Sequence, residues 1–177
     1  MYSVTLTSAG QAYTQKLTLK PDPRIKVPQS VYDQQFALAE RAYDAMGKIA
    51  PALHQASVWE KQIADLHDPA RPSASGDAAQ ALDAFSKQLE TVVGPVRGFG
   101  EEVPDNTAPT LRSVNADLAA ADGAIESADA APTREATGAL AQAEQELSTV
   151  LPQWQSLQQQ AAVLNQKLTA AGLKPLR

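Results

Sequence analysis

The residues that could carry chemistry are few and widely spaced in this chain of 177 residues. Its only histidines, His54 and His67, are separated by neither the three nor the four positions that pair metal ligands on a helix. The chain contains no cysteine, which removes disulfides, thiolate nucleophiles and zinc-thiolate sites together. We therefore predict no metal site and assign neither histidine a catalytic role.

Neighbouring carboxylates occur at Glu101 with Glu102 and at Glu144 with Glu146. A glycosidase needs two such acids facing one cleft, and nothing in the sequence around these pairs makes a cleft. Serines are numerous, but no Gly-x-Ser-x-Gly motif is present to expose one as a nucleophile. We interpret the acidic pairs as solvated faces and predict that this chain has no catalytic residue and is not an enzyme.

The segment Arg97-Gly98-Phe99-Gly100 is rich in glycine but lacks the Gly-Lys-Ser/Thr ending and the preceding strand of a phosphate-binding loop. It therefore predicts no cofactor. The segment lies within the longest irregular stretch, from Gly94 to Pro109, and long loops often carry function. Phe99 either fills the space under the helices or contacts another protein, and we take Arg97 and Phe99 as candidate partner contacts.

The charge balance narrows the choice of partners. The net charge is -5, the pI is near 5.0, and lysines and arginines are scattered singly, so no basic face is available for phosphates. No run approaches 18 apolar residues, and the first residues lack the basic and apolar regions of a signal peptide. These features argue against nucleic acid and membrane as partners, while the absence of cysteine fits either a reducing or an oxidising compartment.

A continuous apolar stripe runs from Ala136 to Leu168 in alternating steps of four and three, which predicts one long helix. Its members are Ala136, Leu140, Ala143, Leu147, Val150, Trp154, Leu157, Ala161, Leu164 and Leu168. Such a stripe needs a partner surface of equal length. The flanking positions lack the charges that select partners in coiled coils, so burial within this chain is favoured over a dimeric coiled coil.

Three further helices are predicted. The first begins at Ser30 as N-cap and covers about 37 residues, or roughly 55 Å. The second runs from Ser75 to Gly94, and the third from near Thr110 to Ala128. The apolar stripe of the first is Tyr32, Phe36, Ala39, Tyr43, Met46, Ile49, Leu53, Ala56, Trp59, Ile63 and Leu66; that of the second is Leu82, Phe85, Leu89 and Val92 or Val93; that of the third is Leu111, Val114, Leu118, Ala121 and Ile125.

The fold class that follows is mainly α, an up-down-up-down four-helix bundle of two long and two shorter helices. The last helix should end at Gly172, where glycine can adopt the left-handed conformation, Leu173 can fold back and Pro175 prevents continuation. Pro51 and Pro152 lie near the middles of the two long helices, and each removes one backbone hydrogen bond. We expect antiparallel pairing to bring both prolines to one level and a kink in each helix there.

Before the bundle, residues 2–19 alternate in polarity with a period of two around a turn at Ser8-Ala9-Gly10, which predicts a β-hairpin. The prolines Pro21 and Pro23 then end the second strand. We assign residues 1–27 to the hairpin and its connector and residues 28–177 to the bundle. Because an isolated hairpin is marginal in water, it either docks on the helices or forms the last two strands of a sheet whose earlier strands precede this chain.

The order of these pieces is similar to a known family. The stretches that carry the likeness are residues 2–7 and 13–19 with Gly10, Asp22-Pro23-Arg24, residues 108–111, residues 127–133, and residues 164–173. They resemble the C-terminal region of large secreted bacterial proteins with a sortilin-like β-propeller of BNR, or Asp-box, repeats, often labelled glycosyl-hydrolase-like. The resemblance implies that the hairpin closes an immunoglobulin-like or fibronectin-like sandwich and that the protein is exported.

No Asp-box motif of the pattern Ser-x-Asp-x-Gly-x-Thr-Trp occurs in the chain, so the resemblance transfers no catalytic residue. We therefore expect a noncatalytic structural or interaction module at the C-terminus of a larger exported propeller protein. Its partner would be the rest of the parent chain or another protein. The alternative is a free-standing helical bundle that binds a protein through residues 94–109.

Overall fold

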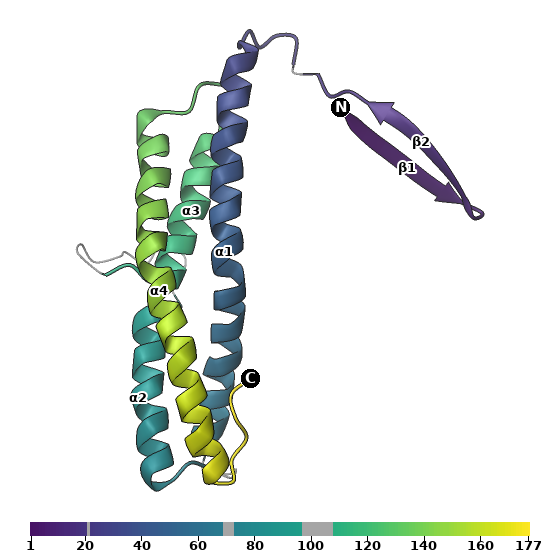
Figure 1. Ribbon diagram of the computed structural model, residues 1–177. Coiled ribbons are helices and arrows are strands. Elements are labelled where there is room, and N and C mark those ends of the chain that lie inside the picture. The colour runs from purple at the N-terminus through teal and green to yellow at the C-terminus, as the bar shows by residue number, and fades with distance from the viewer. Residues whose placement is uncertain (21, 69–72, 97–107) are drawn as a thin grey trace.

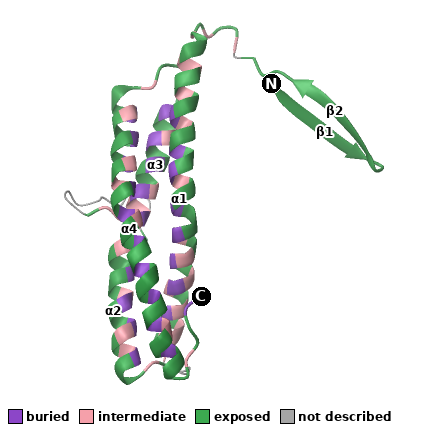
Figure 2. Cartoon of the chain, viewed as in Figure 1, coloured by how far each residue is buried: buried purple, intermediate pink, exposed green. Residues whose placement is uncertain are grey.

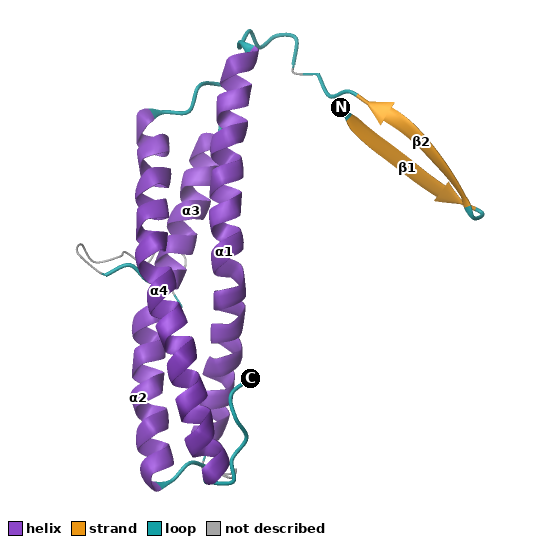
Figure 3. Ribbon diagram, in the orientation of Figure 1, coloured by secondary structure: helices purple, strands orange, loops and turns teal. Residues whose placement is uncertain are grey.

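The computed structural model describes residues 1–20, 22–68, 73–96 and 108–177, and it contains one hairpin and four helices (Figure 1; Figure 3). The hairpin strands are β1 (Tyr2–Ser8) and β2 (Gln11–Leu17). The helices are α1 (Gln29–His67), α2 (Gly76–Val93), α3 (Leu111–Ile125) and α4 (Arg134–Ala170). The predicted mainly α bundle with an N-terminal hairpin is confirmed.

The helix directions differ from simple alternation. Both α2 and α3 run opposite to α1, and they lie one after the other along the bundle, so that α4 runs in the same direction as α1 (Figure 1). The helices have 39, 18, 15 and 37 residues, and together α2 and α3 nearly equal one long helix. This arrangement covers both long stripes over their full length, whereas a short helix facing a long one would leave half of its stripe in water.

Two hydrogen-bonded pairs fix the parallel register of the long helices. Arg41 donates to Glu144 and Gln158 donates to Gln55, and each pair is separated by 103 positions. The parallel order corrects the expectation of antiparallel pairing. The same offset places Pro152 level with Ile49, only two residues from Pro51, so both prolines still lie near one level. Both lie inside continuous helices, and the kink at each of them stays a prediction.

The stripe predicted for the last helix is confirmed in full, because all ten of its residues are buried in α4. Its largest member, Trp154, lies 5.2 Å from Trp59 between ring centroids, and Trp59 lies 5.5 Å from Phe85 in an edge-to-face arrangement. These three rings join α1, α2 and α4. The predicted inward faces of α2 and α3 are buried as well, with Val93 rather than Val92 in the core.

The stripe predicted for the first half of α1 is wrong. Phe36 and Tyr43, expected inside, are 68% and 73% exposed. The residues that face the core are Leu38, Ala42, Ala45, Ile49, Ala52, Ala56, Trp59 and Ile63. Three alanines between Leu38 and Ala56 let α1 lie close to its neighbours, and this close contact turns the larger aromatic side chains outward.

Most of the described helix ends are capped by hydrogen bonds between residues that are close in the sequence. Ser30 is not the N-cap of α1, because the helix already begins at Gln29, directly after Pro28. Thr110 caps α3 in a reciprocal capping box with Ser113, and Thr133 caps α4 by accepting from the Ala136 amide at 3.1 Å. At the far end of α4, Gly172 has φ +75° and the Leu173 amide donates to the Leu168 carbonyl, as predicted.

The hairpin is joined by the two-residue turn Ala9-Gly10, with both residues at positive φ as a type I′ turn requires. Its register pairs Leu6 with Tyr13 and Tyr2 with Leu17. Because residues directly opposite each other share a face, five large apolar side chains lie on one side of the hairpin. We call this side the hairpin face; it consists of Tyr2, Val4, Leu6, Tyr13 and Leu17.

No residue of the hairpin packs against the described part of the helices, and every residue of both strands is exposed (Figure 2). The connector behind it is partly ordered by Asp22, which binds the Arg24 guanidinium at 2.5 Å and accepts from the Arg24 amide. Of the two alternatives for the hairpin, docking on the helices is not the arrangement seen in this structure.

Replacing Trp154 with alanine should cost about 3–5 kcal/mol of unfolding free energy, because it leaves a cavity where the three helices meet. Val163 lies on the same helix and is 56% exposed, so Val163→Ala should change stability by no more than about 0.5 kcal/mol. Urea unfolding followed by circular dichroism measures both. Equal losses for the two variants would contradict burial of the tryptophan.

Candidate functional site

The predicted contacts Arg97 and Phe99 lie outside the described residues, but the two ends of their loop are well defined. At the first end, Gly94 terminates α2 with φ +81° and ψ 165° while its amide donates to the Glu90 carbonyl at 2.8 Å. At the other end, Thr110 begins α3. A Cβ atom on Gly94 would lie 2.3 Å from Thr110 Oγ1, so the ends of the loop touch and only glycine fits there.

Arg112 fastens this junction to the rest of the bundle. Its guanidinium donates to the Gly94 carbonyl and, at 2.8 and 3.0 Å, to both carboxylate oxygens of Glu60. Because the Arg112 side chain is only 22% exposed, the fork-like ion pair is partly shielded from water. One side chain thereby joins α1, the end of α2 and the start of α3, and it fixes where the loop leaves the bundle.

The other candidates from the sequence are not brought together into a reactive centre. His54 is exposed, and His67 lies 3.6 Å from the Asp83 carboxylate at the end of α1. Glu144 binds Arg41, and Glu146 accepts from Gln142 at 2.9 Å. Within the described ranges, no three His, Asp or Glu residues are arranged to hold a metal ion. The pair Glu101 and Glu102 lies outside the described residues.

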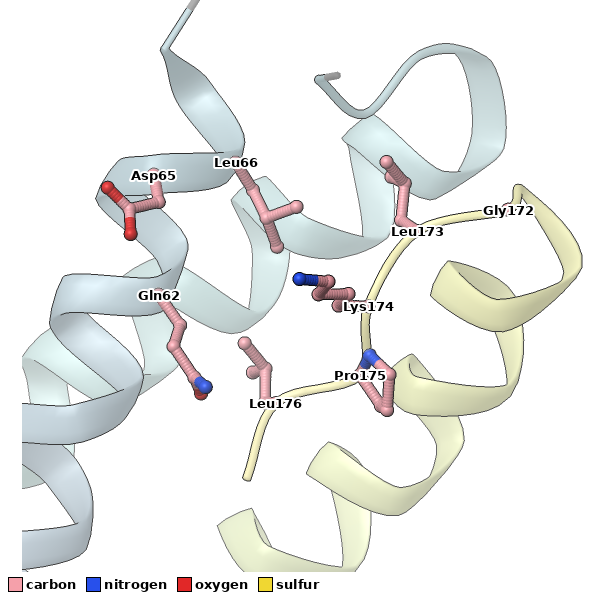
Figure 4. Close-up of a pocket in the computed structure, with 8 residues that line it drawn as sticks. All are labelled: Gln62, Asp65, Leu66, Gly172, Leu173, Lys174, Pro175 and Leu176. Carbon is pink, nitrogen blue, oxygen red and sulfur yellow. The ribbon is translucent and has the colours of Figure 1, made fainter. Parts of the chain in front are cut away.

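A pocket of about 400 Å³ lies where the C-terminal segment folds back over the end of α1 (Figure 4). Leu176 is 5% exposed, and Asn165 holds it in place by accepting from its amide at 2.7 Å and donating to its carbonyl at 3.0 Å. The pocket is lined by Gln62, Asp65, Leu66, Gly172, Leu173, Lys174, Pro175 and Leu176. Sequence analysis missed this return, although an apolar residue directly after Pro175 is a signal for it.

A shallower groove separates α3 from α4 and is lined mostly by alanines, with Asp117 and Glu146 at its side. Burial raises the pKa of Asp117, and the nearby Glu146 carboxylate adds to this rise. The folded protein therefore disfavours the ionised form of Asp117. Glu135 and Gln142 also line the groove, and the carboxylates of the described residues are not arranged there to hold a metal ion.

Most of the large apolar side chains that are exposed in the described part of the chain lie at its N-terminal end. The five side chains of the hairpin face are between 48% and 65% exposed. On α1, Phe36 and Tyr43 are two helical turns apart and point away from the bundle, as their exposed fractions show. Exposed apolar side chains gathered on one face, as on the hairpin, mark an interaction site more often than a catalytic one.

Comparison with known protein families, with curated proteins and with solved structures finds no match for this chain. Among the described residues, none of the helices combines the length and the apolar character that a bilayer crossing requires. Function must therefore be argued from the surfaces of this molecule.

Gly94→Ala should destabilise the protein by roughly 2–4 kcal/mol, since it adds backbone strain and a collision with Thr110. Gly172→Ala is the matched control, because φ is +75° but no atom lies within 4 Å of the added carbon. Strain alone should cost this variant about 1 kcal/mol. Chemical unfolding of both variants measures the difference, and a smaller loss at Gly94 than at Gly172 would contradict the close junction.

Asp117→Asn should raise the thermal unfolding midpoint at pH 7 by a small amount, equivalent to a few tenths of a kcal/mol. A raised pKa in the folded state means that ionisation of Asp117 opposes folding. The free energy of unfolding of the native protein is therefore reduced at pH values above the folded pKa. The gain should therefore vanish as the pH falls below the ordinary aspartate value of 3.8. Asp44→Asn on the exposed side of α1 is the control. A gain that persists at pH 3 would exclude ionisation as its cause.

Proposed function

We propose that this chain is a noncatalytic structural and interaction module, in which the hairpin completes the β-sheet of another domain and the helical bundle supports it. One observation carries the proposal. The hairpin has an apolar face and a polar face, and no described residue of the bundle covers the apolar one. The polar face holds Ser3, Thr5, Thr7, Thr14 and Lys16, as expected for the solvent side of a sheet.

The energetics favour such a partner. A two-stranded hairpin is marginal in water by itself, whereas three or more strands with a covered face are stable. Fully burying a large apolar side chain contributes about 1.5–3 kcal/mol, so covering the exposed halves of five contributes roughly 4–7 kcal/mol. Free backbone groups along both strands offer additional pairing with a neighbouring strand.

The family resemblance suggests which sheet this partner is. It implies that the sheet belongs to an immunoglobulin-like or fibronectin-like sandwich of the same parent protein, next to a BNR-repeat propeller, and that the parent is exported. In this proposal, the glycan or other ligand site lies in the propeller, and this chain contributes no catalytic residue.

A second candidate function uses the loop of residues 94–109 to bind a protein partner. The clamp of Arg112 on Gly94 and Glu60 supports it, because a loop with fixed ends loses less conformational freedom on binding. Arg97 and Phe99 are the contacts proposed for that role.

The test uses the coding sequence upstream of this chain. We expect it to encode further strands in the same reading frame and, before them, a propeller. Hydrogen exchange of β1 and β2 should slow strongly in a protein extended by those strands, compared with the chain of 177 residues.

Two adjacent substitutions provide the control. Leu6→Lys places a charge on the hairpin face and should abolish the added protection, whereas Thr5→Lys lies on the polar face and should leave it intact. Equal effects would contradict the assigned faces. Absence of upstream strands would favour the loop hypothesis, and hydrolysis of any member of a glycan panel by this chain alone would overturn both proposals.

A further inference from the structure

The two edges of the hairpin differ in chemistry. β1 contains no charged residue, no proline and no glycine, whereas β2 carries Lys16 and is soon followed by Lys20. Proteins use lysine side chains, among other means, to protect a sheet edge from pairing with another chain. The β1 edge therefore lacks a protection that the β2 edge has.

The backbone groups of β1 that face outward are those of Ser3, Thr5 and Thr7. Ser8 and Gln11 flank the two-residue turn, so they form a hydrogen-bonded pair. Because hydrogen-bonded and other pairs alternate in an antiparallel ladder, the amides and carbonyls of Ser3, Thr5 and Thr7 point away from β2. No described residue of the helices packs against the hairpin, so these groups are open to another strand (Figure 1).

β1 is complementary to a second copy of itself. When two β1 strands pair antiparallel over their full length, a two-fold axis passes beside Thr5, and Thr5 of one chain lies opposite Thr5 of the other. On the apolar side, Val4 of each chain then lies opposite Leu6 of the other. On the polar side, Ser3 lies opposite Thr7. In the middle of the strand, apolar side chains thus meet apolar ones and hydroxyls meet hydroxyls.

Thr5 and Thr14 already form one half of a row of threonines across such a sheet. Their Oγ1 atoms are 3.0 Å apart within the hairpin. A hydroxyl donates one hydrogen bond and accepts others, so Thr5 keeps capacity for Thr5 of the second chain. Pairing extends the row across four strands, and Thr–Thr pairs are among the favourable cross-strand pairs.

β2 does not have this complementarity. The corresponding antiparallel pairing about Thr14 would place Tyr13 opposite Gln15 on the apolar side. It would also place Leu17 opposite Gln11. Apolar side chains would then meet amides, so the edge that fits a second copy is β1. The β2 edge stays available to the sheet of the proposed function.

The pairing of two β1 strands also keeps the two bundles apart. The connectors leave from the two outer strands, and they leave at opposite ends because the inner strands are antiparallel. All acidic residues except Asp22 lie in residues 28–177, so both bundles are negatively charged. They leave the sheet at opposite corners, where screening by salt weakens their repulsion.

From these observations we propose that β1 is a dimerisation edge, which pairs antiparallel with β1 of a second copy about Thr5. The product is a four-stranded sheet, which exceeds the two strands that are marginal in water. The hairpin faces of both copies lie on one side of this sheet and stay uncovered. The inference therefore goes beyond the proposed function, which concerns the cover of that face.

Sedimentation equilibrium of the whole chain measures the association. An interface of one strand per chain is small, so we expect a dissociation constant on the order of 100 μM. The chain should then be mostly monomeric at about 10 μM and mostly dimeric at about 1 mM. A chain that is still monomeric at the higher concentration would overturn the proposal.

Amide hydrogen exchange recorded by NMR at both concentrations identifies the edge. The outward amides of β1, those of Ser3, Thr5 and Thr7, should exchange about fivefold more slowly in the concentrated sample. The outward amide of Thr14 on β2 should not change. Slower exchange at Thr14 without slower exchange at Thr5 would assign the contact to β2 and overturn the proposal.

Charge variants test the predicted register. Thr5→Lys places two lysines opposite each other at the two-fold axis and should keep the chain monomeric at about 1 mM. Thr14→Lys is the matched control, because it adds the same charge to the same face of the neighbouring strand and should leave the association unchanged. Thr5→Glu alone should be monomeric as well.

An equimolar mixture of Thr5→Lys and Thr5→Glu chains should restore the dimer, because opposite charges then meet at the axis. Restoration also verifies that both variants fold. Dimers that persist in Thr5→Lys, or a mixture that stays monomeric, would overturn the proposal. Since the proposed function expects Thr5→Lys to retain the protection by upstream strands, the failure of either proposal is observed separately.

Discussion

Two long apolar stripes, from Leu38 to Ile63 on α1 and from Ala136 to Leu168 on α4, impose the main constraint on this molecule. The stripes of α1 and α4 need cover over their whole length, and α2 and α3 provide it only by lying end to end in the opposite direction. The end of α2 and the start of α3 consequently meet halfway along the bundle rather than at its end (Figure 1). There the chain needs a residue without a side chain, Gly94, and a charged clamp, Arg112 on Glu60, to join three helices at one point.

The faces of α2, α3 and α4 were predictable from sequence because each has a single periodic set of large apolar residues. In the first half of α1 two periodic sets of apolar residues occupy the same stretch of sequence but lie on different faces of the helix. The aromatic set through Phe36 and Tyr43 is the more hydrophobic, but the alanine set through Ala42 and Ala45 permits closer helix packing and faces the core. Helix direction was not predictable, because a loop of known length limits only the distance between its ends.

The side chains that join separate helices were not predicted from the sequence, because their partners lie far away along the chain. Arg112 meets Glu60 across 52 positions, and Asn165 meets Leu176 across 11, whereas periodic patterns relate residues three or four positions apart. The Thr110 and Thr133 caps and the Gly172 terminus depend on neighbours in sequence, and only the last of these was predicted in detail. Arg97 and Phe99 lie outside the described residues and keep the status of candidates.

The distribution of exposed apolar side chains links the fold to function. Of the eleven large hydrophobic residues that are exposed in the described chain, nine lie between Met1 and Tyr43. Nearly all large apolar side chains of α2, α3 and α4 are buried in the core, so the apolar surface that still gains from cover is concentrated at one end. The amphipathic hairpin, its connector and the exposed Phe36 and Tyr43 of α1 belong to this part of the chain. A surface that gains stability only by being covered is suited to recognise another protein surface, and for this reason the proposed interaction is assigned to the N-terminal end of the chain rather than to the pocket beside Leu176.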